Sequence, residues 1–191
     1  EDECGITVQK RNGDLQISIP LKKGKEFLGH QQYGVKWLQN CWISGYRGCL
    51  LADDMGLGKT LQALSFISWI RKIKEPNQKN KILIVAPVVL LENWKNEYGR
   101  FMEPVFGPFY ELHDKGLRDI KMKEISKTLN IRKEIDVRNK EEAEKILKMG
   151  RGLLLDIHEL AKHQVILTTY ETARDYQFSL GLIKWDVLVL D

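Results

Sequence analysis

Hydrophobic and polar residues follow two alternating periods along this chain, and together they predict helices and strands in turn. Helical spacing places Val35, Leu38 and Trp42 on one stripe, which predicts a helix over residues 30–44. Residues 60–72 are apolar on nearly every side, as in a helix that is buried against a sheet, and the only polar stripe comprises Gln62, Ser65, Ser68 and Lys72. Three continuous apolar runs are typical of buried parallel strands, and they lie at residues 82–86, 165–167 and 187–190. Strands that alternate with helices predict a three-layer parallel α/β fold.

The remaining segments carry weaker patterns. Apolar residues at helical spacing predict a core-facing helix over residues 91–101, in which Trp94 is interpreted as a packing residue. Residues 15–19 alternate between apolar and polar, which predicts a half-buried strand, and a further short strand is expected within 107–112. Residues 115–148 are rich in Lys, Arg and Glu and carry two apolar stripes, which predict two amphipathic helices.

The chain is organised around a glycine-bearing turn between the apolar run 50–52 and the helix at 60–72. Strand, loop and helix in this order, with the wording Gly-x-Gly-Lys-Thr, are typical of a phosphate-binding loop. Glycines let several backbone N–H groups converge on one small concavity without Cβ clashes. Lys59 would supply a positive charge for the β and γ phosphates, and the Thr60 hydroxyl would face magnesium. The candidate nucleotide-binding residues are Asp53, Asp54, Met55, Gly56, Leu57, Gly58, Lys59 and Thr60.

One position departs from the general pattern. Asp53 stands where the strict motif has its first glycine, five residues before Gly58. A chance Gly-Lys-Thr at the start of a helix is the alternative interpretation, although the surrounding strand and helix pattern favours the nucleotide site. The carboxylates of Asp53 and Asp54 would repel phosphates, so we expect them to point away or to reach the helix N-terminus.

Composition limits the class of protein without identifying its partners. The 191 residues fit one domain, and 43% apolar content is that of a globular protein. No apolar stretch is long enough to span a bilayer, and the acidic start is unlike a signal peptide, so an intracellular protein without a membrane partner is expected. Three cysteines without paired spacing predict reduced thiols rather than a disulfide framework or a zinc site. A net charge of +4 permits nucleic-acid binding but does not demonstrate it.

The stretch Leu51-Ala52-Asp53-Asp54-Met55-Gly56-Leu57-Gly58-Lys59-Thr60-Leu61-Gln62 resembles the first motif of the Swi/Snf-type ATPases, the DNA translocases of helicase superfamily two. That family also lacks the first glycine, which accounts for Asp53. The segment 27–38 resembles the family's glutamine motif, and counting back from Gly34 places the adenine-reading glutamine on Gln31. A carboxamide offers a donor and an acceptor together, which suits the edge of adenine. The alternative is an ordinary surface glutamine.

Two later segments resemble family motifs that touch DNA. Residues 86–94 resemble a motif whose loop contacts the DNA backbone, but Val89 replaces its usual serine, so phosphate contacts would fall to main-chain N–H groups, Asn93 or Lys95. The segment 168–171 reads Thr-Thr-Tyr-Glu like another family motif, which implies that Thr169 faces a DNA phosphate. A helix cap is the equally open alternative for Thr169, because Thr is a good capping residue.

The last strand pattern ends in an acid, Asp191. An acid at the C-terminal end of an apolar strand is the Walker B arrangement, which holds magnesium opposite the phosphate loop. Lys59 and Asp191 are therefore the candidate catalytic residues, and Thr60 and Asp191 the candidate metal ligands. In the resembling family a Glu follows this Asp and positions the attacking water, and that position lies beyond residue 191.

The resemblance implies a lead-in segment at 1–26 and the first RecA-like lobe of a two-lobe motor at 27–191, with a charged helical insertion at about 115–150. Such motors bind ATP and magnesium, move on double-stranded DNA and use a second lobe, so we expect this chain alone to bind nucleotide and to turn over little. A prokaryotic protein would be cytoplasmic and a eukaryotic one nuclear. Three alternatives stay open: a strand-separating RNA or DNA helicase, a small-molecule kinase, and a nucleotide-gated interaction module whose partner binds the insertion, where a solvated charged face is the simpler reading.

Overall fold

We analysed a computed structural model of the protein, which describes residues 10–11, 13–15, 19–73, 80–121 and 155–191. The chain divides into two compact units. The first unit comprises Glu1–Lys79 and Glu92–Phe106, and the second comprises Asn80–Leu91 and Gly107–Asp191. Within the described residues, no helix is long and apolar enough to cross a membrane.

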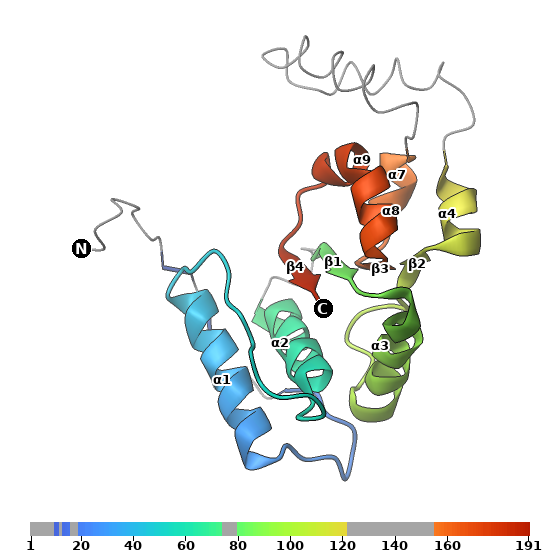
Figure 1. The fold of residues 1–191 in the computed structure, drawn as a ribbon. Helices are drawn as coiled ribbons and strands as arrows, with labels where there is room; N and C mark the ends of the chain where they lie inside the picture. The colour runs from blue at the N-terminus through green and yellow to red at the C-terminus, as the bar shows by residue number, and fades with distance from the viewer. Residues whose placement is uncertain (1–9, 12, 16–18, 74–79, 122–154) are drawn as a thin grey trace. The chain divides into compact units, whose positions relative to one another are not determined.

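The second unit is built on a four-stranded sheet (Figure 1). Its strands are β1 (Ile82–Val85), β2 (Tyr110–Leu112), β3 (Val165–Thr168) and β4 (Val187–Leu190), in the order β2-β3-β1-β4. Every pairing is parallel. The central strands β1 and β3 are buried at all four positions, because apolar side chains on both faces need cover on both sides. The parallel α/β fold predicted from the alternating patterns is confirmed.

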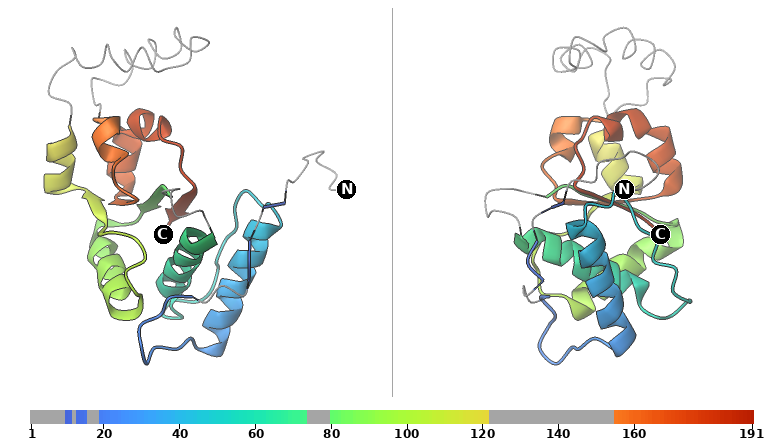
Figure 2. Two further views of the ribbon diagram at one scale, coloured as in Figure 1. Left: turned by 180° about the vertical axis from the view of Figure 1, so that it is seen from behind. Right: turned by 90° about the vertical axis from the view of Figure 1, so that its left-hand side faces the viewer.

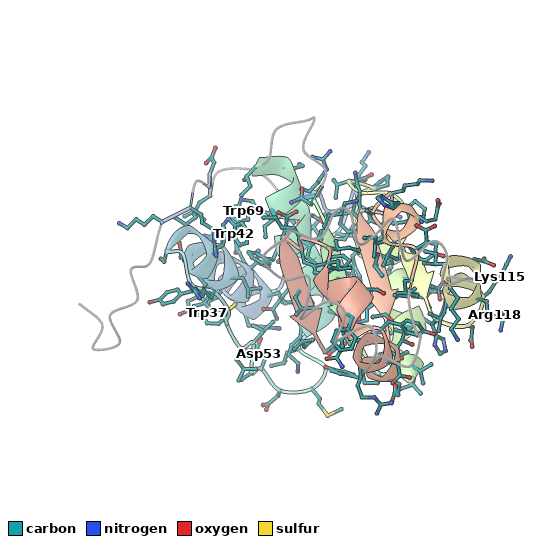
Figure 3. All side chains as sticks on the ribbon, turned by 90° about the horizontal axis from the view of Figure 1, so that it is seen from above. Trp37, Trp42, Asp53, Trp69, Lys115 and Arg118 are labelled. Carbon is teal, nitrogen blue, oxygen red and sulfur yellow. The ribbon has the colours of Figure 1, made fainter. Side chains whose placement is uncertain are left out.

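Short helices pack on one face of this sheet (Figure 1). They are α4 (Asp114–Ile120), α7 (Ile157–Leu160), α8 (Tyr170–Asp175) and α9 (Gln177–Gly181). Their apolar residues and those of the strands form one core, which includes Leu83, Ile166, Leu160, Tyr176 and Leu180. Of the predicted insertion, only its beginning is described, where Lys115 and Arg118 extend from α4 (Figure 3). The two helices predicted across 115–148 otherwise lie outside the described residues.

The prediction of β4 as a core strand was wrong. Its residues alternate between half-buried and exposed, and Leu188 and Leu190 are 54% and 63% exposed. The reason is its position, since β4 is the last strand in the order and pairs with β1 alone among the described strands. An apolar run predicts a strand, but the neighbours decide whether both faces are covered.

The first unit contains α1 (Gly29–Ile43), α2 (Lys59–Ile73) and most of α3 (Val88–Phe101). Helices α1 and α2 lie side by side in each view (Figures 1 and 2). The predictions of helices over 30–44, 60–72 and 91–101 are confirmed to within a few residues at the ends. Three residues of the polar stripe of α2 are buried, and only Lys72 is exposed. Burial of Ser65 and Ser68 is possible because their hydroxyls donate to the carbonyls four residues earlier, those of Leu61 and Leu64.

The apolar run at residues 50–52 does not form the predicted strand. Residues 48–54 have no regular secondary structure, and Leu50 is 81% exposed. A strand requires a hydrogen-bonded neighbour, and none of the four described strands pairs with residues 50–52. The strand predicted at 15–19 cannot be followed, since residues 16–18 lie outside the described part of the chain.

Candidate functional site

The turn after residue 52 has the backbone that its glycines predict. Gly56 and Gly58 have φ angles of 83° and 77°, in the left-handed region that side chains with a Cβ rarely adopt. Met55, next to the first glycine, is 95% exposed. The turn leads directly into α2, whose first turn contains no acidic residue to offset the partial positive charge of the helix N-terminus. The loop therefore ends at the N-terminus of α2, whose partial positive charge is not offset by an acidic side chain in the first turn.

The side chain of Lys59 folds back over this turn. Its Nζ donates to the carbonyl oxygens of Asp53, at 2.7 Å, and of Asp54, at 3.0 Å. An ammonium group has three donors, so these two bonds leave a third for another acceptor. Thr60 follows as the second residue of α2 and is half-buried. The predicted cationic and hydroxyl groups thus stand together at the helix start.

Three side chains contact the carbonyl oxygen of Leu57. Nε2 of Gln31 lies 3.3 Å from it, Nε2 of Gln62 lies 3.5 Å from it, and Nε2 of His30 lies 3.2 Å from it. The first and third come from α1 and the second from α2, so the loop is held between the two helices. His30 can donate here only in the tautomer that carries its proton on Nε2.

Gln31 has a second task in the structure. Its Oε1 accepts a hydrogen bond from the backbone N–H of Leu28 at 3.1 Å, which caps the first turn of α1. The residue is only 8% exposed, so it is not the surface glutamine of the alternative interpretation. The structure brings Gln31 against the loop through a contact that the sequence could not specify, and its role in reading adenine stays a prediction.

The carboxylate of Asp53 turns toward α2 rather than toward the concave side of the loop. Its Oδ2 accepts from Nε2 of Gln62 at 3.1 Å. Asp54 accepts from Lys59 through its backbone carbonyl. Of the two arrangements that we expected for Asp53, this contact agrees with a carboxylate that points away, and the partner is the Gln62 side chain instead of the helix N-terminus.

Three residues at this site were not predicted: His30, Gln62 and Gly34. Gln62 was assigned to the polar stripe of a helix, and nothing in its sequence position distinguishes a buried amide from an exposed one. Gly34 makes room for it, since a Cβ at position 34 would lie 1.8 Å from Gln62 Oε1. His30 and Gly34 lie four residues apart in the sequence, which predicts that both lie on the same face of a helix.

A cavity of about 270 Å³ lies next to the loop in the first unit. Its walls are α1 and the segment that precedes the loop, and its lining residues are His30, Tyr33, Gly34, Trp37, Leu50, Leu51, Ala52 and Asp53. Trp37 and Asp53 are labelled in Figure 3. The aromatic side chains give this cavity a surface on which a flat ring can stack.

The second unit contains the other motif residues. Thr169 is the N-cap of α8, and its Oγ1 accepts from the backbone N–H of Thr172 at 3.2 Å. Its side chain is buried, which agrees with the capping alternative. The hydroxyl of Tyr170 donates to the backbone carbonyl of Asp191 at 2.8 Å, so the end of β3 and the end of β4 are joined. The pKa of Glu171 is lowered by a hydrogen bond from its own backbone N–H and then by the Thr169 hydroxyl.

Asn93 and Lys95 lie on α3 and are already engaged with acids on that helix. Asn93 Nδ2 donates to Glu97 Oε1 at 3.2 Å, and Lys95 Nζ lies 2.6 Å from Glu92 Oε2. Surface ion pairs of this kind contribute only about 0–1 kcal/mol, so a competing phosphate could draw the lysine away. Among the described residues, no group of three or more His, Cys, Asp and Glu side chains could hold a metal ion.

The two loop glycines should respond differently to alanine. Each change places a Cβ at positive φ, which costs about 1–2 kcal/mol. At Gly56 the added Cβ meets nothing within 4 Å, whereas at Gly58 it would lie 2.6 Å from Gln31 Nε2. We expect Gly58→Ala to weaken binding of a fluorescent ATP analogue more than Gly56→Ala, because it also displaces Gln31. Equal losses in a binding titration would contradict the packing of Gln31 on the loop.

Thr169→Val should remove the cap of α8 while keeping the side-chain shape. The loss of one capping bond is expected to lower the free energy of unfolding by about 1 kcal/mol in urea titrations. The pKa of Glu171 should rise toward its ordinary value, as an NMR titration of the carboxyl carbon would show. Since its folded pKa is lowered, its contribution to stability exists above the ordinary pKa and is lost as the pH falls through the folded value. Thr169→Ser keeps the hydroxyl and should behave as the unmutated protein.

Comparison with known proteins gives concordant results. A sequence model of the family described as "SNF2-related domain" matches residues 30–191. The Zorya protein ZorD of Escherichia coli O139:H28 is 36% identical over 184 residues, which are 95% of this chain and 16% of that protein. The ATP-dependent helicase FUN30 of Saccharomyces cerevisiae is 30% identical over 202 residues, covering 97% of this chain and 14% of that protein. The chain thus spans less than a fifth of the length of either relative.

Among solved structures, the Sulfolobus solfataricus SWI2/SNF2 ATPase core in complex with dsDNA is similar with a TM-score of 0.55. The match covers 87% of this chain and 26% of that chain at 24% identity. At this identity the likeness shows the fold, which is the RecA-like α/β lobe that the first motif implied.

Proposed function

This chain belongs to the SNF2-related domain family, and from that premise we propose that it is the nucleotide-binding lobe of a DNA-dependent ATPase that translocates on double-stranded DNA. The observation that carries the proposal is the loop at 53–60. Two glycines at positive φ, a lysine over the turn and an unopposed helix N-terminus form a site for an anion with several negative charges.

The residues of this loop fit the phosphates of ATP. Lys59 now bonds two loop carbonyls, and phosphate oxygens that carry full charges would compete well for the same ammonium group. Asp53 does not oppose them, because its carboxylate is engaged by Gln62. The role of Lys59 would be to balance charge on the β and γ phosphates, and the loop N–H groups would orient them.

Gln31 retains the capacity to recognise adenine. A carboxamide has two N–H donors and an oxygen with two lone pairs. One donor is directed to Leu57 and one lone pair to the N–H of Leu28, which leaves one of each. This remaining pair suits the edge of adenine, while the helix cap fixes the orientation of the side chain.

Magnesium would be held through oxygen ligands, for which the Thr60 hydroxyl and the Asp191 carboxylate are suitable donors. A bound magnesium ion would neutralise part of the charge that develops on the transferred phosphoryl group. On the protein side, Asp191 is fixed by main-chain contacts: its N–H donates to Val85 at 3.0 Å, and its carbonyl accepts from Tyr170. These contacts would orient its side chain at the end of β4.

The duplex DNA part of the proposal is supported by family membership and by the SWI2/SNF2 ATPase core that was solved with dsDNA. The residues that we propose for backbone contacts are Asn93, Lys95 and Thr169. The first two offer an amide and an ammonium group on α3, and the third lies at the N-terminus of α8. Further partners in this proposal are a second RecA-like lobe, which would complete the ATPase, and a protein that binds the insertion at 115–150. An intracellular location follows from a DNA substrate.

ATP hydrolysis by the full-length protein tests this proposal. We would compare reactions without nucleic acid and with duplex DNA, single-stranded DNA or RNA at one fixed salt concentration, because phosphate contacts depend on salt. Strong stimulation by duplex DNA is expected. Hydrolysis without any preference for duplex DNA would refute the translocase while leaving the nucleotide site intact, and strand displacement would instead indicate a helicase.

A further inference from the structure

Gln62 is the most deeply buried polar side chain around the phosphate-binding loop. It is completely inaccessible to solvent and lies in the first turns of α2, three residues after Lys59. Its Nε2 donates to Asp53 Oδ2 at 3.1 Å and approaches the Leu57 carbonyl at 3.5 Å. A buried amide is costly unless it is hydrogen-bonded. Here the partners are two groups of the loop, the carboxylate of Asp53 and the backbone carbonyl of Leu57.

The opposite end of the same carboxamide faces α1. Gln62 Oε1 has no hydrogen-bond partner among the described residues, and it occupies the space that a side chain at Gly34 would fill. A Cβ at position 34 would lie only 1.8 Å from it. Glycine within a helix costs about 1 kcal/mol relative to alanine. The absence of a side chain at position 34 is thus what permits Gln62 to lie between α1 and the loop.

On these contacts we propose that Gln62 is a positioning residue for nucleotide binding, which holds the phosphate-binding loop in shape and transmits the position of α1 to it. This inference rests on the proposed nucleotide site and adds a residue that does not touch the nucleotide. By keeping the Asp53 carboxylate directed toward α2, Gln62 would lower the charge repulsion that the phosphates meet. By approaching Leu57, it would act beside Gln31, which connects the same carbonyl to α1.

Gly34→Ala is the complementary change, because its Cβ would displace the Gln62 carboxamide from its present position without altering the loop itself. Both Gln62→Leu and Gly34→Ala should weaken binding of a fluorescent ATP analogue to the full-length protein by about tenfold, as expected for one hydrogen bond to a charged group. Leucine has nearly the volume of glutamine and removes a buried unpaired oxygen, so the melting temperature of Gln62→Leu should not fall. Loss of affinity without loss of stability is a result that a purely structural role would not give.

The double variant Gln62→Ala/Gly34→Ala, compared with Gln62→Ala and Gly34→Ala alone, tests whether both positions act through the same contact. In Gln62→Ala the space beside position 34 is free, so the added Gly34→Ala should weaken ATP binding no further than Gln62→Ala does alone and should raise the melting temperature. Two controls match the single changes. Gln39→Leu replaces another buried glutamine, eight residues beyond Gln31, and Gly99→Ala adds a Cβ to α3 where nothing lies within 4 Å. Both should bind the analogue as the unmutated protein does.

The outcomes separate this inference from the proposed function. If the unmutated protein binds the analogue, Lys59→Ala weakens binding by about a hundredfold or more and Gln62→Leu weakens it by about tenfold, both stand. If Gln62→Leu binds as tightly as the unmutated protein, or if the two losses simply add in the double variant, the positioning role is refuted and the nucleotide site survives. If the unmutated protein binds no nucleotide, both are refuted.

Discussion

Replacing Lys59 with Ala is expected to abolish ATP hydrolysis by the full-length protein and to weaken nucleotide binding by at least tenfold. The side chain would face the β and γ phosphates, and each charge-assisted hydrogen bond of this kind is worth about 1.5–3 kcal/mol. Since every 1.4 kcal/mol is a factor of ten in affinity, loss of two such bonds gives a decrease of about a hundredfold or more. Hydrolysis should fall further, because the charge on the γ phosphate grows in the transition state.

The fold should survive this change. The two carbonyls that Lys59 now bonds, those of Asp53 and Asp54, lie on a turn with access to water. The melting temperature of Lys59→Ala should therefore match that of the unmutated protein. Lys36→Ala, which removes an exposed lysine from α1, serves as the charge-matched control. Retention of duplex-stimulated hydrolysis by Lys59→Ala would show that another site hydrolyses ATP.

Trp69→Ala is expected to produce the largest loss of stability, about 3–5 kcal/mol of the free energy of unfolding. Trp69 lies in α2 (Figure 3) and is completely buried. Its ring stacks on Phe66 with centroids 6.1 Å apart, and the rings of Phe66 and Trp42 form a T-shaped pair. Its indole N–H donates to the carbonyl of Asp14 at 2.8 Å, which fastens the segment before α1 to the helix pair. Many domains have only 5–15 kcal/mol in total, so this variant should be partly unfolded at 37 °C.

Urea titrations followed by circular dichroism would measure this loss. Trp69→Phe separates the two contributions, because it keeps most of the packing and leaves the Asp14 carbonyl without its donor, at a cost of about 1–3 kcal/mol. Tyr33→Ala, which removes an exposed aromatic side chain of α1, should change stability little. A Trp69→Ala variant as stable as the unmutated protein would show that the segment at 10–15 and the aromatic contacts do not contribute to the core.

The segment that precedes α1 illustrates a contact that periodicity cannot reveal. Arg11 lies over the ring of Trp42 at 4.4 Å and donates to the carbonyl of Tyr46 at 2.9 Å. Its sequence neighbours are polar, so the pattern predicts a solvated lead-in. The planar guanidinium finds both an aromatic face and a helix end only because α1 and the lead-in fold together.

The glycine turn at residues 56–58 and the helices α1 and α2 on either side of it could be predicted from the sequence alone, whereas the strand expected at 50–52 could not. A turn at positive φ favours glycine strongly, as at Gly56 and Gly58. The apolar periods of α1, α2, β1 and β3 leave few alternatives to a parallel α/β lobe. These signals are local, since each depends on the dihedral angles or side-chain directions of residues near one another in the chain. They were sufficient to identify the family, whereas the nucleotide site stays a prediction.

Only the tertiary structure decided the surroundings of that loop. Gln62 is buried although it belongs to the polar stripe of α2, and β4 has an exposed face although its residues are apolar. The side chain of Gln31 caps α1 and donates to the carbonyl of Leu57 in the loop. Burial and hydrogen-bond partners depend on residues distant in sequence, such as Gly34 for Gln62. A polar side chain is stable in the protein interior only where such neighbours leave room for it and provide hydrogen bonds. The chain encodes each element locally, whereas the contacts that would tune a nucleotide site arise where elements meet.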